Sequence, residues 1–150
     1  MESVEERKRT GVVLVVDDDE DLLEVDRLAL EGAGYRVFTA RNGREGLALV
    51  HQVKPDVIVL DIMMETLTEG FDVASRLMGD ADTRRIPVVM VSGWTQAVKV
   101  PDKFRVAQKR PHPLGQAGPL DGRLSLATAY YEKPVSPARL VQIVNKILTR

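Results

Sequence analysis

Acidic side chains stand at two points of the sequence, each at the end of a short apolar run. Asp17-Asp18-Asp19 follows Val12–Val16, and Asp61 ends the almost wholly apolar run Asp56–Asp61. Carboxylates brought together need a cation or a proton, because two unit charges about 4 Å apart repel by roughly 4 kcal/mol near a protein surface. With oxygen ligands only, the hard cation Mg²⁺ suits such a site better than Ca²⁺, since few carboxylates leave room for waters and phosphate.

Two further apolar runs end in residues that can handle phosphate. Val88–Val91 precedes Ser92, and Thr128–Tyr131 precedes Glu132 and Lys133. A lysine can neutralise phosphoryl oxygens, a hydroxyl can donate to one of them, and the carboxylate of Asp61 could attack phosphorus. Together the four runs predict phosphoryl chemistry, provided that the fold brings their ends to one place.

The apolar runs have the length and composition of buried strands, and a fifth strand is predicted over Tyr35–Thr39. Amphipathic helices are predicted between them. The first follows Asp19, its expected N-cap, ends at Gly32 and Gly34, and is expected to bury Leu22, Val25, Ala29 and Ala33. A second helix is predicted to begin at Asn42-Gly43. A third follows a loop over Ile62–Gly70 and contains the apolar residues Phe71, Ala74, Leu77 and Met78. The last begins at Ser136-Pro137.

Strands that alternate with helices predict a parallel sheet covered on both faces. In such sheets the functional site lies at the carboxyl ends of the strands, beside the point where the strand order reverses. We therefore expect the side chains at the strand ends to share one edge; they are Asp17, Asp18, Asp61, Ser92 and Lys133.

Two segments do not fit this pattern. Residues 1–10 are rich in Glu, Arg and Lys and are expected to form a flexible tail. From Thr95 to about Leu126 the chain contains four prolines and three glycines and lacks helical or strand periodicity. This segment is locally basic, and we interpret it as an irregular insertion at about 95–127 within one domain that spans 11–150.

Composition limits the classes of function. The chain has 150 residues, 44% of them hydrophobic, which suits one globular domain with a substantial core. A net charge of −1 gives no overall reason to bind DNA or an anionic membrane. The chain has no cysteine, no signal peptide and no apolar run of membrane-spanning length, so we expect a cytoplasmic protein.

The ordered motifs resemble the receiver domain of two-component response regulators. They are Val13–Asp19, Leu60-Asp61-Ile62-Met63-Met64, Val91-Ser92 and Lys133-Pro134, and they cover about 11–150 apart from the insertion. The resemblance implies a flavodoxin-like, doubly wound α/β fold whose five-stranded parallel sheet has the strand order 2-1-3-4-5. It also implies Mg²⁺ as the cofactor and a sensor histidine kinase or phosphotransfer protein as the partner.

The same resemblance assigns roles to individual residues. Asp61 would accept the phosphoryl group, with Lys133 and Ser92 assisting the transfer. Asp17, Asp18, Asp61 and the Met63 backbone carbonyl would bind Mg²⁺. Ser92 and Tyr130 would form the pair that rearranges on phosphorylation.

The sequence also departs from the family pattern. Glu65 stands where the family usually has proline, and the segment after it is about one residue longer than usual. The insertion occupies the place of the fourth helix, which is therefore either altered or replaced. Since that helix belongs to the surface that changes on activation in the family, partner choice cannot be carried over from typical members.

These observations predict a single-domain receiver that catalyses its own aspartyl phosphorylation and signals through a protein contact, as a monomer or weak homodimer, and that is not otherwise an enzyme. Met63 and Trp94 stand where the family places residues beside the hydrolytic water, so we expect slow loss of the phosphoryl group.

Two alternatives stay open. One is a receiver-like binding module that no longer switches. The other is a haloacid-dehalogenase-like phosphohydrolase that uses Asp17 as its nucleophile, because Asp17-x-Asp19 fits that family's acid pair.

Overall fold

The computed structural model describes residues 11–61, 69–92, 129–132 and 135–149. Its strands are β1 (Val12–Val16), β2 (Arg36–Ala40), β3 (Val57–Asp61), β4 (Val88–Ser92) and β5 (Ala129–Glu132). Its helices are α2 (Glu20–Gly32), α3 (Gly43–Val53), α4 (Glu69–Gly79) and α6 (Pro137–Leu148). The flexible tail predicted at 1–10 and nearly all of the predicted insertion lie outside the described residues.

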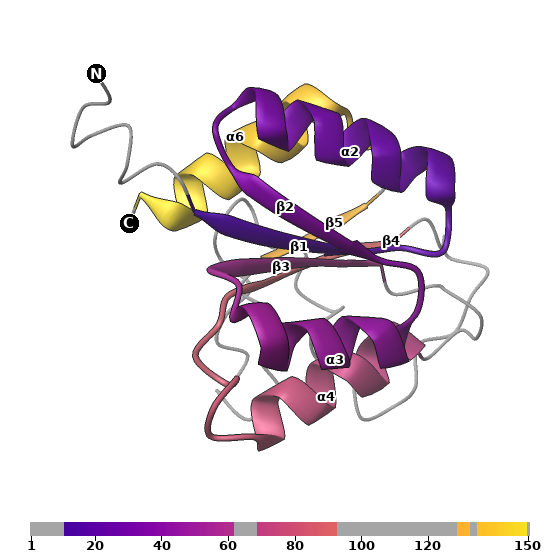
Figure 1. Cartoon of the computed structure of the whole chain (residues 1–150), viewed down its shortest axis with the longest axis vertical. Coiled ribbons are helices and arrows are strands. Elements are labelled where there is room, and N and C mark those ends of the chain that lie inside the picture. The colour runs from indigo at the N-terminus through magenta and orange to yellow at the C-terminus, as the bar shows by residue number, and fades with distance from the viewer. Residues whose placement is uncertain (1–10, 62–68, 93–128, 133–134, 150) are drawn as a thin grey trace.

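The strands form one parallel sheet in the order β2-β1-β3-β4-β5. Helices cover both faces, with α2 and α6 on one side and α3 and α4 on the other (Figure 1). This confirms the predicted α/β class and the order 2-1-3-4 of the first four strands. The described residues of β5 pair with β4, Val89 with Ala129 and Met90 with Tyr130. The predicted change in the fourth helix falls on residues that the structure does not describe.

Alternation along the central strands divides the core into two layers. In β1, Leu14 and Val16 pack against α3 and α4, while Val13 and Val15 pack against α2 and α6. In β3 the residues Ile58 and Leu60, and Val57 and Val59, divide in the same way. Successive strand side chains point to opposite faces, so a strand covered on both faces is apolar throughout. Packing of the core therefore explains the apolar residues of such a strand, but it does not explain a polar residue at the strand's end, such as Asp61.

Helix α2 shows a correction to the predicted packing face. We expected Val25 and Ala33 to be buried, but Val25 is 45% exposed and Ala33 is exposed as well. The buried residues are instead Leu23 and Leu30. Leu23 and Leu30 are seven positions apart, and a stripe through them fits the helical period as well as the predicted stripe does. The contact of α2 with the sheet and with α6 decides which of the two stripes is buried.

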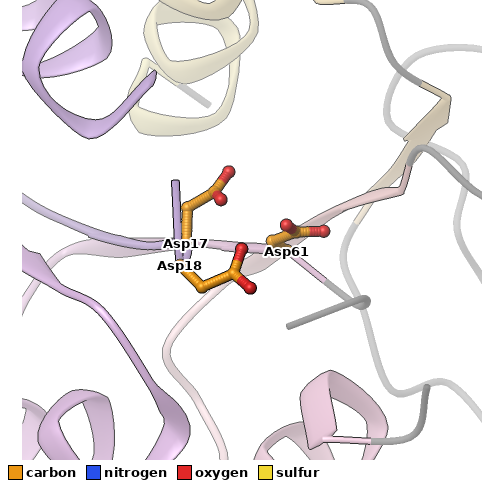
Figure 2. Close-up of side chains that lie close together, drawn as sticks. All are labelled: Asp17, Asp18 and Asp61. Carbon is orange, nitrogen blue, oxygen red and sulfur yellow. The ribbon is translucent and has the colours of Figure 1, made fainter. Parts of the chain in front are cut away.

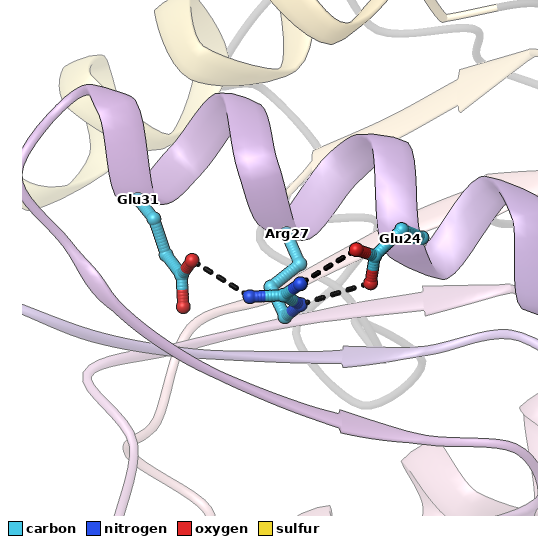
Figure 3. A network of polar contacts seen from close by, with 3 residues as sticks. All are labelled: Glu24, Arg27 and Glu31. Carbon is cyan, nitrogen blue, oxygen red and sulfur yellow. Dashed lines mark hydrogen bonds and ion pairs between the residues drawn. The ribbon is translucent and has the colours of Figure 1, made fainter.

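Arg27 lies between Leu23 and Leu30 on this stripe and is half-buried. Its guanidinium donates to both oxygens of Glu24, at 3.1 and 2.6 Å, and to Glu31 at 2.8 Å (Figure 3). The hydrogen bond to Glu24 and the charges of the two glutamates raise the pKa of Arg27. The two carboxylates thus compensate the charge of an arginine at the edge of the packing face.

Helices α2, α3 and α6 begin where they were predicted to begin, each after a capping side chain. Asn42 accepts from the Glu45 N–H at 2.9 Å, and Ser136 accepts from the Arg139 N–H at 3.1 Å. Asp19 accepts from the N–H groups of Asp21 and Leu22, at 3.0 and 3.2 Å, and so starts α2 directly after the acidic turn. A side chain that satisfies these orphan donors fixes where the helix begins.

We expect Asp19→Ala to lower the free energy of unfolding by about 1 kcal/mol, because two N–H groups of α2 lose their acceptor. Asp19→Asn is the matched variant, since an asparagine caps a helix about as well as an aspartate and removes the same charge. Urea unfolding would measure both. Equal losses of stability in the two variants would show that the charge of Asp19, and not its cap, stabilises the helix.

Candidate functional site

The carboxyl ends of β1 and β3 bring three carboxylates together. These strands are neighbours, with Val16 opposite Leu60, so Asp17 and Asp61 follow at the same level of the sheet. Asp17, Asp18 and Asp61 each place one carboxylate oxygen within 4.8 Å of the others (Figure 2). Asp17 and Asp61 are buried, at 5% and 4% exposure, and Asp18 is exposed. The cluster is therefore closed on its inner side and open to solvent at Asp18.

Local hydrogen bonds hold Asp17 in place. Its N–H donates to the carbonyl oxygen of Ala40 at 3.0 Å, which extends the pairing of β1 with β2 by one residue. Its Oδ1 accepts from the Asp19 N–H at 2.9 Å, an Asx turn that bends the chain towards α2. The same turn presents Asp18 outward, beside the two buried acids.

The arrangement suits a hard divalent cation. Two carboxylates almost without solvent contact, with a third alongside, repel one another unless a cation or proton balances them. The donors are carboxylate oxygens, which Mg²⁺ prefers, and the exposed side at Asp18 admits the waters that Mg²⁺ retains. The described residues therefore fit the predicted magnesium site.

Next to the cluster lies an open acidic depression of about 610 Å³, lined by Asp18, Asp19, Glu20, Asp21, Arg41 and Asn42. Arg41 donates to Glu20 at 2.5 Å, and this hydrogen bond, with the charges of Glu20 and Glu45, raises the pKa of Arg41. The ion pair joins the start of α2 to the residues after β2. It therefore connects the acidic turn to the neighbouring corner of the fold.

On the other side, between α2 and α6, a cavity of about 360 Å³ adjoins Asp17 and Asp61. Its wall is mostly apolar, with Leu22, Val135 and Leu140 among the lining residues, and it includes Asp26 of α2. Asp26 was not predicted at the site, because the expected helix face placed it among the solvated residues. It lies one turn after Leu22, which lines the same cavity.

For the remaining predicted site residues, the structure describes either the backbone without the side chain or neither of them. Asp61 pairs with Val91, so Ser92 ends β4 next to the tip of β3. Tyr130 lies in β5 opposite Met90. The side chains of Ser92 and Tyr130, and the whole of Met63 and Lys133, lie outside the described residues. Their predicted roles stay predictions.

The sequence matches a known protein family and is similar to known members of it. The model of the response regulator receiver domain matches residues 13–107. Protein PilH of Pseudomonas aeruginosa is 33% identical over 136 residues, which cover 91% of this chain and 96% of PilH. The polar-differentiation response regulator DivK of Brucella anthropi is 29% identical over 136 residues, covering 91% of this chain and 94% of DivK.

Solved structures give the same result for the fold. The chemotaxis protein CheY4 of Vibrio cholerae superposes with a TM-score of 0.69 at 27% sequence identity, covering 92% of this chain and 98% of CheY4. The similarity extends beyond the strand ends that carry the motifs. It includes most of the chain on both sides of the sheet.

Proposed function

This chain belongs to the response regulator receiver family, a family of two-component signalling modules, and we propose that Asp61 is its phosphoacceptor. The observation that supports this assignment is the cluster of Asp17, Asp18 and Asp61, with oxygens within 4.8 Å at the end of the central strand. Of the three, Asp61 is the one at the end of β3, the strand that pairs with β4. It is therefore the acid nearest in strand order to Ser92 at the end of β4 and to β5.

The proposed reaction is a phosphoryl transfer to a carboxylate. An oxygen of Asp61 attacks the phosphorus of a phosphohistidine or of acetyl phosphate. The new O–P bond forms while the donor's P–N or P–O bond breaks, and the electron pair leaves with the imidazole or the acetate. The product is an acyl phosphate on Asp61.

The other residues of the chain bind and neutralise. Asp17, Asp18, Asp61 and the Met63 carbonyl would hold Mg²⁺, which when bound neutralises charge on the phosphoryl oxygens. Lys133 supplies a second positive charge at those oxygens and Ser92 a hydroxyl donor, and burial of the Asp61 carboxylate strengthens each of these interactions. Rearrangement of Ser92 and Tyr130 would pass the change to the surface.

Incubation with acetyl phosphate and Mg²⁺, followed by intact-mass measurement, tests the proposal. We expect one phosphoryl adduct that requires Mg²⁺. The absence of an adduct, with no response of the protein to Mg²⁺, would instead support the receiver-like binding module that does not switch.

The phosphoryl group should be lost slowly. Met63, at one of the two positions assigned to the hydrolytic water, has only a weak acceptor, and Trp94, at the other, has a single N–H donor and no acceptor, so neither orients the water well. We expect a half-life of minutes or longer. Following the adduct by mass after removal of acetyl phosphate measures it. Introducing a polar residue with Met63→Asn should shorten the half-life, and a wild-type half-life of seconds would contradict this account.

The remaining proposals concern organisation and partners. We place the receiver domain at 11–150, after the tail at 1–10, with the full strand order 2-1-3-4-5 and an altered or replaced fourth helix in the insertion at about 95–127. A sensor histidine kinase or phosphotransfer protein in the cytoplasm would supply the phosphoryl group, and a protein target would receive the signal. Within the described part of the chain, the helices are all too short or too polar to cross a membrane.

A further inference from the structure

Glu69 is the first residue of α4 and the first described residue after Asp61. Its carboxylate accepts a hydrogen bond from the Gly43 N–H at 2.5 Å, between residues 26 positions apart. Gly43 is the first residue of α3, and its N–H belongs to the group of helix donors that have no partner within the helix. A carboxylate at this end of a helix is further favoured by the helix dipole.

The two helix starts are in close contact because Gly43 has no side chain. A Cβ atom at Gly43 would lie 2.7 Å from Cγ2 of Val73 and 3.0 Å from Oε2 of Glu69. Val73, one turn after Glu69, is buried in the core layer that also contains Val16 and Leu60. Val16 and Leu60 directly precede Asp17 and Asp61. The first turn of α4 is thus fixed both to α3 and to the strand ends that carry the acids.

The start of α3 is itself tied to the acidic turn. Asp17 donates to Ala40, and Arg41 pairs with Glu20, so the residues just before Gly43 hold the segment after β1. The bond from Gly43 to Glu69 then joins this corner to the start of α4. The acidic turn after β1 and the start of α4 are in this way connected through three polar contacts.

From this geometry we propose that Glu69 is a positioning residue for the acidic site. Its carboxylate fixes the point at which the chain returns from Asp61, and so maintains the arrangement that binds Mg²⁺ and accepts the phosphoryl group. The inference rests on the proposed function for the phosphoryl step. The part that concerns Mg²⁺ can be tested without that step.

The test compares Glu69→Ala with Asp56→Ala. Asp56 makes the same kind of bond, a carboxylate that accepts from a distant backbone N–H, here that of Val12 at 2.7 Å. It precedes β3, at the end of the strand opposite to Asp61. Both variants should unfold at a lower urea concentration than the wild type. Only Glu69→Ala should also bind Mg²⁺ about tenfold more weakly in a calorimetric titration and form the acetyl phosphate adduct about tenfold more slowly.

Glu69→Gln keeps a carbonyl oxygen that can accept from Gly43, and should therefore recover most of the Mg²⁺ affinity. Mg²⁺ affinities of Glu69→Ala equal to wild type, or losses of equal size in Asp56→Ala, would overturn the proposal. A wild-type protein that forms no adduct would contradict the proposed function instead, and the Mg²⁺ affinities of the variants would then decide on Glu69.

Discussion

Asp61→Asn should abolish the phosphoryl adduct that acetyl phosphate and Mg²⁺ produce. The amide has no carboxylate oxygen to attack phosphorus, and it removes the negative charge of one of the three clustered carboxylates proposed to hold the cation. The fold should survive the change, because the amide has nearly the shape of the carboxylate and relieves repulsion between two buried acids, Asp17 and Asp61. Intact mass gives the adduct directly, and urea unfolding reports the stability.

Asp26→Asn is the control for this experiment. Asp26 lines the same cavity as Asp17 and Asp61 but is not one of the three clustered acids. The variant removes one negative charge close to the site and should still form the adduct. If Asp61→Asn were phosphorylated as fast as Asp26→Asn, Asp61 would not be the phosphoacceptor.

Asp18→Asn should remove most of the stabilisation that Mg²⁺ gives to the wild type. A ligand present at 100 times its dissociation constant stabilises a protein by about 2.7 kcal/mol. For a domain of this size that corresponds to a rise of roughly 5 to 10 °C in the unfolding temperature. Asp18 is the exposed member of the cluster, so its replacement should cost little packing. Thermal unfolding with and without Mg²⁺ measures the effect.

Without Mg²⁺, Asp18→Asn should be at least as stable as the wild type, since one of the mutually repelling charges has gone. Asp21→Asn is the matched variant, because Asp21 is an exposed acid of the same depression outside the cluster. It should keep the full response to Mg²⁺. A response in Asp18→Asn as large as that in Asp21→Asn would mean that Asp18 does not bind the cation.

The strands could be predicted from the sequence because each is a short apolar run in a sheet buried on both faces. The described strand ends differ from the predicted ends by at most one residue: Val12–Val16 matches the prediction, and Val88–Ser92 is one residue longer than predicted. The caps Asp19, Asn42 and Ser136 were also predictable, since a capping side chain acts on residues two or three positions away. Such local signals need no knowledge of the tertiary structure.

The face of α2 could not be predicted in this way. Leu22, Val25, Ala29 and Ala33 form an apolar stripe that is as regular as the observed one through Leu23 and Leu30. The choice between the two depends on where the helix meets the sheet and α6, which the helical period does not contain. Asp26 was placed on the wrong side of the helix for the same reason.

At the site, sequence reasoning identified the carboxylates that share an edge because parallel strands end at the same edge. It did not identify Glu69 or Gly43, whose contact joins residues 26 positions apart at the starts of two helices. The only available signal was that a glycine after the N-cap Asn42 permits close approach of another segment. Nothing in the sequence said that this segment would be α4.

Chemical mapping can show which residue carries the phosphoryl group, which we propose to be Asp61. Borohydride reduces an aspartyl acyl phosphate to homoserine, and peptide mass analysis locates the changed residue. We expect homoserine at position 61 and unmodified Asp17 and Asp18. Homoserine at position 17 would contradict this expectation and would support the phosphohydrolase alternative, in which Asp17 is the nucleophile.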